Sequence, residues 1–298
     1  MPSSIPDSPP HMTPPTKTPS LAVYGLGIIG SRVADLLSAA SYPLGTWSRS
    51  SRSRPDFDDD AAALADRSEV ILFFLKDAPA VRETFEAIRP TLRSGKSLIN
   101  HATIDLETTL FLESECRAAG CGFLNAPFTG SKVAAGNGKL VYYCGGDSSV
   151  LEDLRPILDV SSPQIIPMDS ASQATVVKLT TNLISACTVQ ALAESLRISR
   201  AHGVPAETLL DAIQGNACGS ALAAMKVPTM EAEDYDPHFS LSNMLKDSRY
   251  AIDLAEKAGL NTPAIRCVSK EMDTLNRKGL GEQDFSILNS QFKSDNSH

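Results

Sequence analysis

Short apolar runs alternate with amphipathic stretches along the first half of the chain. Val70–Leu75 shows no alternation of polar and apolar residues, which is typical of a strand buried on both faces of a sheet. Repeated strand–helix units imply right-handed crossovers and a doubly wound, mainly parallel sheet. The predicted strands are 21–24, Pro43–Trp47, Val70–Leu75, Ser97–Asn100, Gly122–Ala126, Leu140–Cys144 and Gln164–Pro167, with helices over Ala80–Ile88, Leu106–Ala119 and Val150–Leu158.

After about Asp169 the pattern changes to helices alone. Ala171–Ala201 is one unusually long helical stretch, and no strand pattern of comparable quality follows it. The sequence therefore predicts an α/β half followed by an all-helical half, joined by the long helix. The further predicted helices are Ala206–Ile213, Ser220–Met225, Leu241–Ala258, Pro263–Arg277 and Gln283–Phe292.

A glycine-rich turn joins the first strand to the helix after it. Gly25-Leu26-Gly27-Ile28-Ile29-Gly30 fits the G-x-G-x-x-G spacing of a dinucleotide-binding turn. Gly25 permits the tight turn, Gly27 lets a pyrophosphate approach the backbone, and Gly30 lets the helix pack closely on the strand. The N–H groups that open the helix would face the phosphates. We therefore predict a Rossmann domain over residues 20–169; a plain strand–helix turn is the alternative.

The end of the second predicted strand carries no acid. An NAD-specific site usually has one there, about 20 residues after the glycines, to hold the ribose 2′-hydroxyl. Here the chain reads Ser48-Arg49-Ser50, with Arg52 and Arg54 nearby. Guanidinium groups bind phosphate strongly, so these residues indicate a site for the 2′-phosphate of NADP(H). The alternative is a solvated Arg/Ser loop.

Lys178 stands alone within an otherwise apolar part of the long helix. A buried, unpaired ammonium is unfavourable, so the lysine either reaches the surface or has a purpose. Asn182 is four residues on and therefore lies on the same helix face. A cation beside a carbonyl that receives hydride would stabilise the growing negative charge and deliver the proton.

Composition and charge narrow the classes of partner. The hydrophobic fraction of 42% and the charged fraction of 21% suit a soluble globular protein. A net charge of −8 argues against a nucleic acid or an anionic membrane as the main partner, and no uninterrupted apolar run approaches a membrane span. The six cysteines are scattered without a C-x-x-C pair, which indicates reduced thiols and a cytoplasmic location. The histidines show no metal-ligand spacing, so no metal is predicted.

The first 19 residues are rich in Pro, Ser and Thr, with Lys17 as their only basic residue. They lack the basic start and apolar core of a signal peptide, and the arginines of a transit peptide. We predict a disordered tail over 1–19.

Four motifs in order resemble those of the β-hydroxyacid dehydrogenase family, over roughly residues 20–292. The family includes 3-hydroxyisobutyrate dehydrogenases and glyoxylate/succinic semialdehyde reductases, with imine reductases as relatives. Residues 25–30 match the family's opening glycine turn, and residues 125–131 match its substrate motif. Residues 178–182 match its catalytic K-x-x-x-N, and residues 239–247 match its F-x-L…KD element.

This resemblance implies roles for several residues. Lys178 would be the proton donor in carbonyl reduction, and Asn182 would position it or the substrate. Thr103 and Lys246 would border the cofactor, while Thr129, Gly130, Ser131 and Phe239 would line the substrate site. Residues 170–298 would form the substrate and dimerisation domain of at least a dimer.

The chain departs from the family at positions that would contact the substrate and select it by shape. Asn125 replaces the usual Asp, Phe128 is bulkier than the usual Val, and Thr129 and Ser131 replace Ser and Gly. Three hypotheses follow: an NADPH-dependent reductase that forms a hydroxy acid from a carbonyl near a carboxylate, an NADPH-dependent imine reductase in a biosynthetic pathway, and a catalytically silent NADP-binding scaffold. Intact Lys178 and Asn182 argue against the scaffold.

Overall fold

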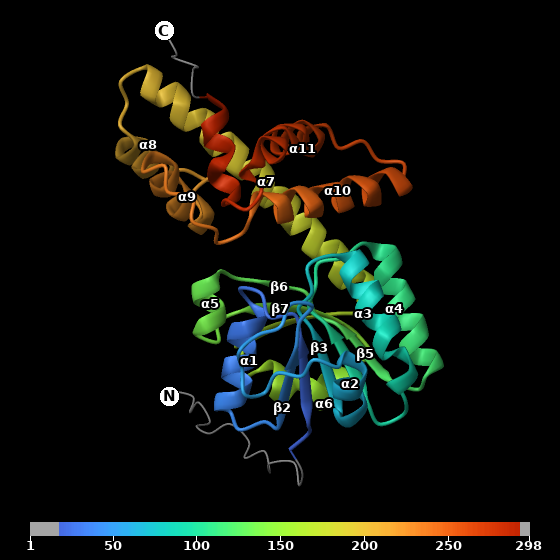
Figure 1. Ribbon diagram of the computed structural model, residues 1–298. Coiled ribbons are helices and arrows are strands. Elements are labelled where there is room, and N and C mark those ends of the chain that lie inside the picture. Colours follow the sequence, from blue (N-terminus) through green and yellow to red (C-terminus); the bar gives the residue numbers. More distant parts are fainter. Residues whose placement is uncertain (1–17, 293–298) are drawn as a thin grey trace, which may run out of the picture.

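The computed structural model describes residues 18–292, drawn in colour in Figure 1. The disordered tail predicted over 1–19 lies outside the described residues, apart from its last two positions. The described chain forms a sheet half and a helical half, with α7 (Ala171–Ala201) running from one into the other.

One sheet of eight strands organises the described N-terminal half, in the order β2-β1-β3-β4-β5-β7-β6 with β8 beside β7. The first five strands of this order are parallel. β7 runs antiparallel to β5 and β6 and parallel to β8. The strands are β1 Leu21–Tyr24, β2 Leu44–Trp47, β3 Val70–Phe73, β4 Ser97–Asn100, β5 Gly122–Asn125, β6 Phe128–Thr129, β7 Val141–Gly146 and β8 Gln164–Met168.

Helices cover both faces of this sheet, as the doubly wound prediction requires (Figure 1). One apolar core joins α1 and α6 to the strands, and a second core on the opposite face joins α2, α3 and α4 to them. β1 and β3 lie between the two cores and are buried at every position, which explains their continuous apolar sequence. The helices are α1 Gly30–Ala39, α2 Ala61–Arg67, α3 Ala78–Ile88, α4 Leu106–Ala118, α5 Lys132–Gly136 and α6 Ser148–Leu158.

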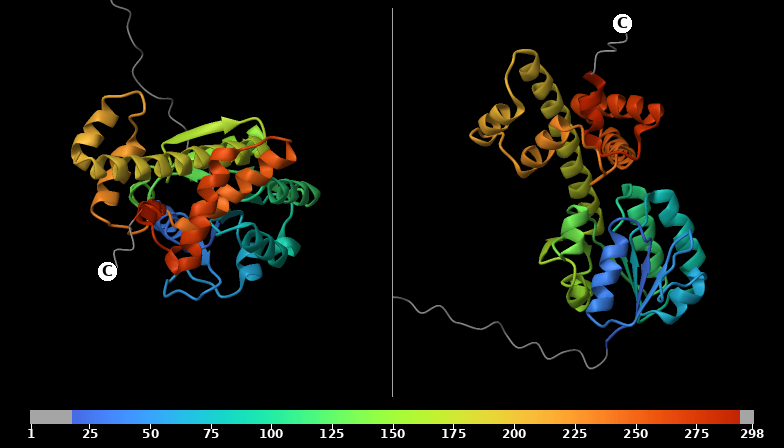
Figure 2. Two further views of the ribbon diagram at one scale, coloured as in Figure 1. Left: turned by 90° about the horizontal axis from the view of Figure 1, so that it is seen from above. Right: turned by 60° about the vertical axis from the view of Figure 1, so that its left-hand side comes forward.

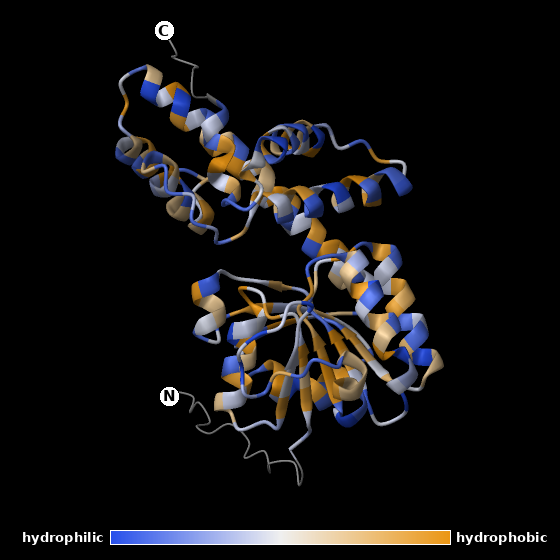
Figure 3. Cartoon of the chain, in the orientation of Figure 1, coloured by the Kyte–Doolittle hydropathy of each residue, from blue (hydrophilic) through white to orange (hydrophobic). Residues whose placement is uncertain are grey.

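The helical half wraps around the distal part of α7 and has its own apolar core (Figure 2). Orange apolar positions of these helices turn towards one another in Figure 3, while blue positions lie outside. The predicted Rossmann half followed by an all-helical half is therefore confirmed. The further elements are α8 Ala206–Gln214, α9 Ala221–Glu231, α10 Leu241–Lys257, α11 Pro263–Leu275, the π-helical η2 Asn276–Leu280 and the 3₁₀-helical η3 Phe285–Phe292.

Some predicted boundaries were wrong. α9 continues to Glu231 with Pro228 inside it, although a proline removes one N–H from the helix. The stretch predicted as a helix over Gln283–Phe292 is a tighter 3₁₀ helix. Two short elements, β6 and α5, were not predicted, since two and five residues are too few to show a period.

α7 is also long and apolar enough to cross a membrane, judged by length and composition alone. Its most apolar window has a mean hydropathy of 1.3, and 44% of that window is buried inside the protein. A core helix of a soluble protein meets the same criteria, so this is weak evidence for a membrane span. The predicted lack of a membrane partner stays a prediction.

Candidate active site

The glycine turn after β1 has the geometry that its sequence predicts. Gly25 has a φ of +99°, and a Cβ there would lie 2.4 Å from the carbonyl oxygen of Phe74. A Cβ on Gly30 would lie 2.0 Å from the Gly25 oxygen, whereas a Cβ on Gly27 would face open space. Leu26 is buried, Ile28 is exposed, and Ile29 precedes α1. The turn therefore leaves Gly27 open to an approaching group, as a bound pyrophosphate needs.

Arg49 and Arg54, which follow β2, have different partners. The guanidinium of Arg49 pairs with Glu83 at 2.8 Å, and both side chains are 72% exposed. Arg54 instead donates to Asp35 at 2.7 Å and to both carboxylate oxygens of Asp56, so it has less freedom to bind a phosphate. Ser48 Oγ donates to the carbonyl oxygen of Ser50 at 2.6 Å.

Residues 46–50 carry no acid, but the fold brings a carboxylate from further along the chain beside β2. Asp56 accepts a hydrogen bond of 3.2 Å from the hydroxyl of Thr46, within β2. The chain folds back there, with the Thr46 N–H donating to the Asp56 carbonyl oxygen. Because Arg54 neutralises this carboxylate, Arg49 and Arg52 are left as exposed cations after the strand end.

Lys178 is buried inside the proximal part of α7 with its side chain 7% exposed. Its Nζ donates to Asn182 Oδ1 at 3.1 Å and lies 6.0 Å from the centre of the Phe128 ring. Burial lowers the pKa of Lys178 to about 8; Asp247 acts in the opposite direction, and Lys246 adds to the lowering. The amine can therefore hold or release a proton near neutral pH.

α10 completes the surroundings of this lysine. Asn182 Nδ2 donates to Asp247 Oδ2 at 2.7 Å, which fixes the amide with its oxygen towards Lys178. Lys246 Nζ lies 3.0 Å from the other oxygen of Asp247. Lys246 also donates to the carbonyl oxygens of Lys76 and Thr103, which follow β3 and β4. The helical half is thereby joined to the carboxyl edge of the sheet next to Lys178.

A chain of buried amides and hydroxyls holds α7 against the sheet. Asn125 Nδ2 donates to Ala171 O and to Thr175 Oγ1, and its Oδ1 accepts from Asn100. The Thr175 hydroxyl also meets that of Thr109 on α4 at 2.7 Å. An aspartate at 125 could not donate to α7 in this way when ionised. The departure at Asn125 thus acts on the placement of the helix that carries Lys178.

His101 is a second buried titratable group near the site. Its Nδ1 lies 2.7 Å from the Ala126 carbonyl oxygen, so this nitrogen carries the proton. The ring stacks on Phe74 with centres 4.3 Å apart, and within the described chain Nε2 meets no hydrogen-bonding group. Burial lowers the pKa of His101 to about 3, so the imidazole is neutral at physiological pH.

The predicted substrate residues lie on both sides of the boundary between the halves. Thr129 is exposed in β6, Gly130 has a φ of +141°, and Ser131 Oγ caps α5 by accepting from the Ala134 N–H. Ser131 therefore has a structural partner already. Phe239 precedes α10 and packs edge-on against Phe285, with ring centres 6.2 Å apart.

Three charged residues at this boundary were given no role from the sequence. Asp247 holds Asn182, and Lys132 forms an ion pair with Asp236 from the loop before α10. Asp247 and Asn182 are 65 positions apart, and Lys132 and Asp236 are 104 apart. Of the three, only Asp247 belongs to one of the four sequence motifs, as the D of the K-D pair in the fourth motif.

A cavity of about 590 Å³ lies beside this site rather than at it. It lies between the starts of α3 and α4 and the C-terminal part of α10, and Lys178 does not line it. Among residues 18–292, no group of three or more His, Cys, Asp or Glu side chains could hold a metal ion. The lining residues are Ala78, Pro79, Arg82, Asp105, Glu107, Thr108, Arg249, Tyr250, Asp253 and Lys257.

Comparison with known families and proteins agrees with this geometry. Residues 20–169 match the NAD-binding domain of 6-phosphogluconate dehydrogenase, and residues 172–290 match a domain described as NAD-binding of NADP-dependent 3-hydroxyisobutyrate dehydrogenase. Glyoxylate/succinic semialdehyde reductase 2, chloroplastic, of Arabidopsis thaliana is 25% identical, over 96% of this chain and 83% of that protein. Glyoxylate/succinic semialdehyde reductase 1 of the same plant is 26% identical, over 89% and 95%.

A solved structure has the same fold at a lower sequence identity. The 3-hydroxyisobutyrate dehydrogenase of Mycobacterium tuberculosis, solved with L-serine, has a TM-score of 0.85 and 21% identity, over 93% of this chain and 100% of that one. The glycine turn, the lysine–asparagine pair on α7 and both domain matches lead to one conclusion. The chain belongs to the β-hydroxyacid dehydrogenase family of NAD(P)-dependent oxidoreductases.

Proposed function

We propose that this protein is an NADPH-dependent reductase of a semialdehyde or keto acid, forming a hydroxy acid. The observation that carries the proposal is the buried Lys178, whose ammonium donates to the amide oxygen of Asn182 and has a pKa near 8. Two relatives are named for glyoxylate and succinic semialdehyde, which are both carbonyl compounds with a carboxylate.

In this proposal Lys178 is the proton donor. The bound nicotinamide cofactor supplies the hydride. As negative charge grows on the substrate oxygen, the ammonium stabilises it and transfers a proton to it. Asn182 contacts the ammonium directly and keeps it facing the site, while Asp247 acts through Asn182 as a positioning residue. Reduction therefore needs the protonated lysine and slows as pH rises through about 8.

We propose NADP(H) as the cofactor because two exposed arginines, Arg52 and Arg49, follow β2 and the carboxylate nearby is neutralised by Arg54. The side chain of Arg49 is 72% exposed. Its ion pair with Glu83 is solvent-exposed and contributes little, so Arg49 can exchange Glu83 for a 2′-phosphate. Ser48 and Ser50 flank Arg49 in the sequence.

Arg49→Ala should raise the KM for NADPH about tenfold or more and leave that for NADH unchanged. Arg266→Ala removes a similar exposed pair, with Glu256, and is the matched control. Equal changes for both cofactors would contradict the assignment.

The substrate class is tested by following NADPH oxidation with short semialdehyde acids, ketones and cyclic imines. Turnover of semialdehyde or keto acids that is lost in Lys178→Met supports the proposal. Turnover limited to imines would favour the second candidate, imine reduction, which the bulkier Phe128 beside the ammonium makes worth testing. Tight NADPH binding without turnover of any of these compounds would favour the scaffold.

We also propose that the protein self-associates through the outward side of α7. Ile184 and Ile198 are more than 60% exposed on this helix, and a second copy could cover them. Ile184→Lys should then shift the species seen by sedimentation velocity towards the monomer. A wild-type protein that sediments as a monomer would contradict this.

A cytoplasmic location is proposed from the scattered cysteines, and a fluorescent fusion found in an organelle would contradict it.

A further inference from the structure

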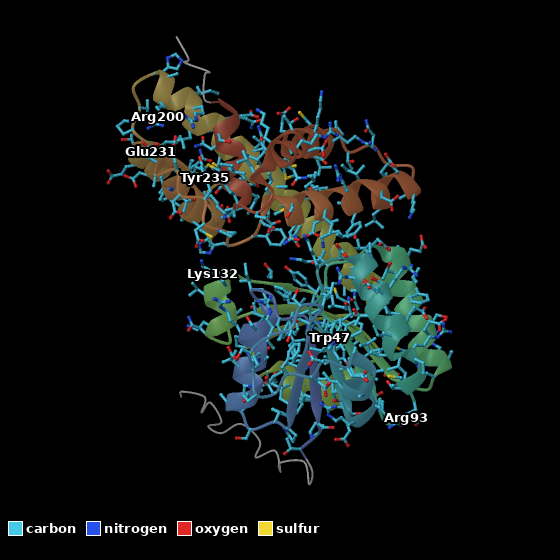
Figure 4. The ribbon with its side chains drawn as sticks, in the orientation of Figure 1. Trp47, Arg93, Lys132, Arg200, Glu231 and Tyr235 are labelled. Atoms are coloured by element: carbon cyan, nitrogen blue, oxygen red, sulfur yellow. The ribbon has the colours of Figure 1, made fainter. Side chains whose placement is uncertain are left out.

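An ion pair joins the residue that follows the substrate motif to the loop before α10. The Lys132 ammonium pairs with the Asp236 carboxylate, and Figure 4 shows Lys132 on α5 at the side that faces the helical half. Lys132 directly follows Gly130 and Ser131, for which the family resemblance implies a place in the substrate site. Its side chain is 30% exposed, and that of Asp236 is 63% exposed. The pair therefore lies at the border of the substrate site rather than in a core.

Both partners are held by well-anchored backbone. Lys132 begins α5, whose start is capped by Ser131. The loop that carries Asp236 is fastened by Asp284, which accepts from the N–H groups of His238 and Phe239 at 3.0 and 3.2 Å. The backbones are thus fixed while the two charged side chains stay free to change partner.

Two other lysines at this boundary, Lys246 and Lys178, already have partners. Lys246 donates to two carbonyl oxygens and pairs with Asp247. Lys178 holds Asn182 and, in the proposed function, faces the reacting carbonyl. A substrate with a carboxylate a few atoms from its carbonyl offers a second anionic group that a cation can bind. Lys132 is suited to this because its partner is an exposed carboxylate, and such surface pairs contribute little net stability.

We propose that Lys132 selects substrates by their carboxylate, which replaces Asp236 on the ammonium when the substrate binds. This inference rests on the proposed function and adds the residue that distinguishes an aldehyde acid from a neutral aldehyde. Asp236 is then a competitor built into the protein: it occupies the cation in the free enzyme and repels a substrate carboxylate that approaches in any other position.

The test compares succinic semialdehyde with butanal, which has the same chain length and no carboxylate. Lys132→Met should raise the KM for succinic semialdehyde about tenfold to a hundredfold, because a charge-assisted contact is lost, with kcat little changed. Butanal kinetics should not change. Lys132→Arg should keep the preference, and Asp236→Asn should lower the KM for succinic semialdehyde a few-fold. Lys139→Met removes an exposed lysine from the same segment and is the control.

The outcomes separate the two proposals. Wild-type enzyme that binds NADPH but reduces neither compound, nor any other semialdehyde or keto acid of the panel, overturns the proposed function and the inference with it. Turnover with equal effects of Lys132→Met on both compounds overturns the inference alone, as does a wild-type preference for butanal. Melting temperatures of each variant establish that a change in KM does not come from partial unfolding.

Discussion

Lys178 and Lys226 are both buried lysines on helices, but their ammonium groups meet different partners. Lys226, on α9, forms an ion pair of 2.6 Å with Asp284 and lies 4.6 Å from the centre of the Phe285 ring. Lys178 is held by one amide oxygen at 3.1 Å, and its nearest carboxylate acts through Asn182. The ion pair offsets the cost of burying the Lys226 ammonium. The Lys178 ammonium can still donate to another acceptor.

The partners of Asp284 show how complete the compensation is in the helical core. Burial by itself would raise the pKa of Asp284, but the charge and hydrogen bond of Lys226 and the bond from Ser286 lower it below its usual value. Lys96, at the far end of the sheet, is compensated in another way, since its Nζ donates to three carbonyl oxygens within 2.7 Å. Lys226 and Lys96 thus meet charged or multiple acceptors, and the contrast with Lys178 supports the proposed catalytic role of Lys178.

The largest expected effect is on catalysis. Lys178→Met should lower kcat for carbonyl reduction by about 10²–10⁴-fold, because the proton donor and the charge that stabilises the oxyanion are both lost. NADPH affinity, measured by fluorescence titration, should change little. Lys139→Met is the matched control for the loss of one charge. A Lys178→Met enzyme with near wild-type kcat would end the proposed role.

The second effect is on folding. Lys226→Met leaves the Asp284 carboxylate buried without its ion-pair partner and should lower the free energy of unfolding by about 3–5 kcal/mol. The double variant Lys226→Met/Asp284→Asn removes both charges and should recover part of this loss. Denaturant unfolding at pH 7 measures both. A single variant as stable as wild type would mean that the comparison between the two lysines is mistaken.

The third effect is a gain in stability rather than a loss. Lys178 has a lower pKa in the folded protein than the 10.5 of an exposed lysine, so its ammonium opposes folding at neutral pH. Lys178→Met should therefore raise the free energy of unfolding by on the order of 1–3 kcal/mol at pH 7. The gain should be full below pH 8 and fade as the pH rises towards 10.5, where both states of the wild type are neutral. Unfolding at pH 7 and at pH 10 tests this, and a destabilised variant at pH 7 would contradict it.

The smallest effect is a shift in pH dependence. Asp247 raises the pKa of Lys178 and Lys246 lowers it. Asp247→Asn should move the fall in kcat/KM for reduction to lower pH, and Lys246→Met should move it to higher pH, each by less than about one unit. Shifts in the same direction, or none, would show that another group controls the profile.

Much of the fold was predictable because its determinants are local. The buried strands β1 and β3 show themselves as apolar runs, and Gly25 stands where a positive φ and the nearby Phe74 oxygen exclude a side chain. Lys178 stood out as a lone charge among apolar residues. Short elements such as β6 and α5 could not be predicted in this way, because pairing with β7 and the Ser131 cap create them.

The partners of the site residues were not predictable, because they come from distant positions. Nothing near Asn182 in the sequence indicates that Asp247 fixes its amide, and nothing near Lys132 points to Asp236. The same holds for Lys226 and Asp284, which are 58 positions apart. Burial and pairing of a charge are set by packing, so a single sequence shows that a lysine is unusual without showing whether it is compensated.

The pKa of Lys178 itself tests this account most directly. NMR titration of the full chain with ¹³C-labelled lysine side chains follows each ammonium separately. The account predicts one lysine that titrates near pH 8, with a signal that disappears in Lys178→Met. If every lysine signal instead titrates near pH 10 or above, Lys178 is an ordinary ammonium and the proposed proton transfer fails.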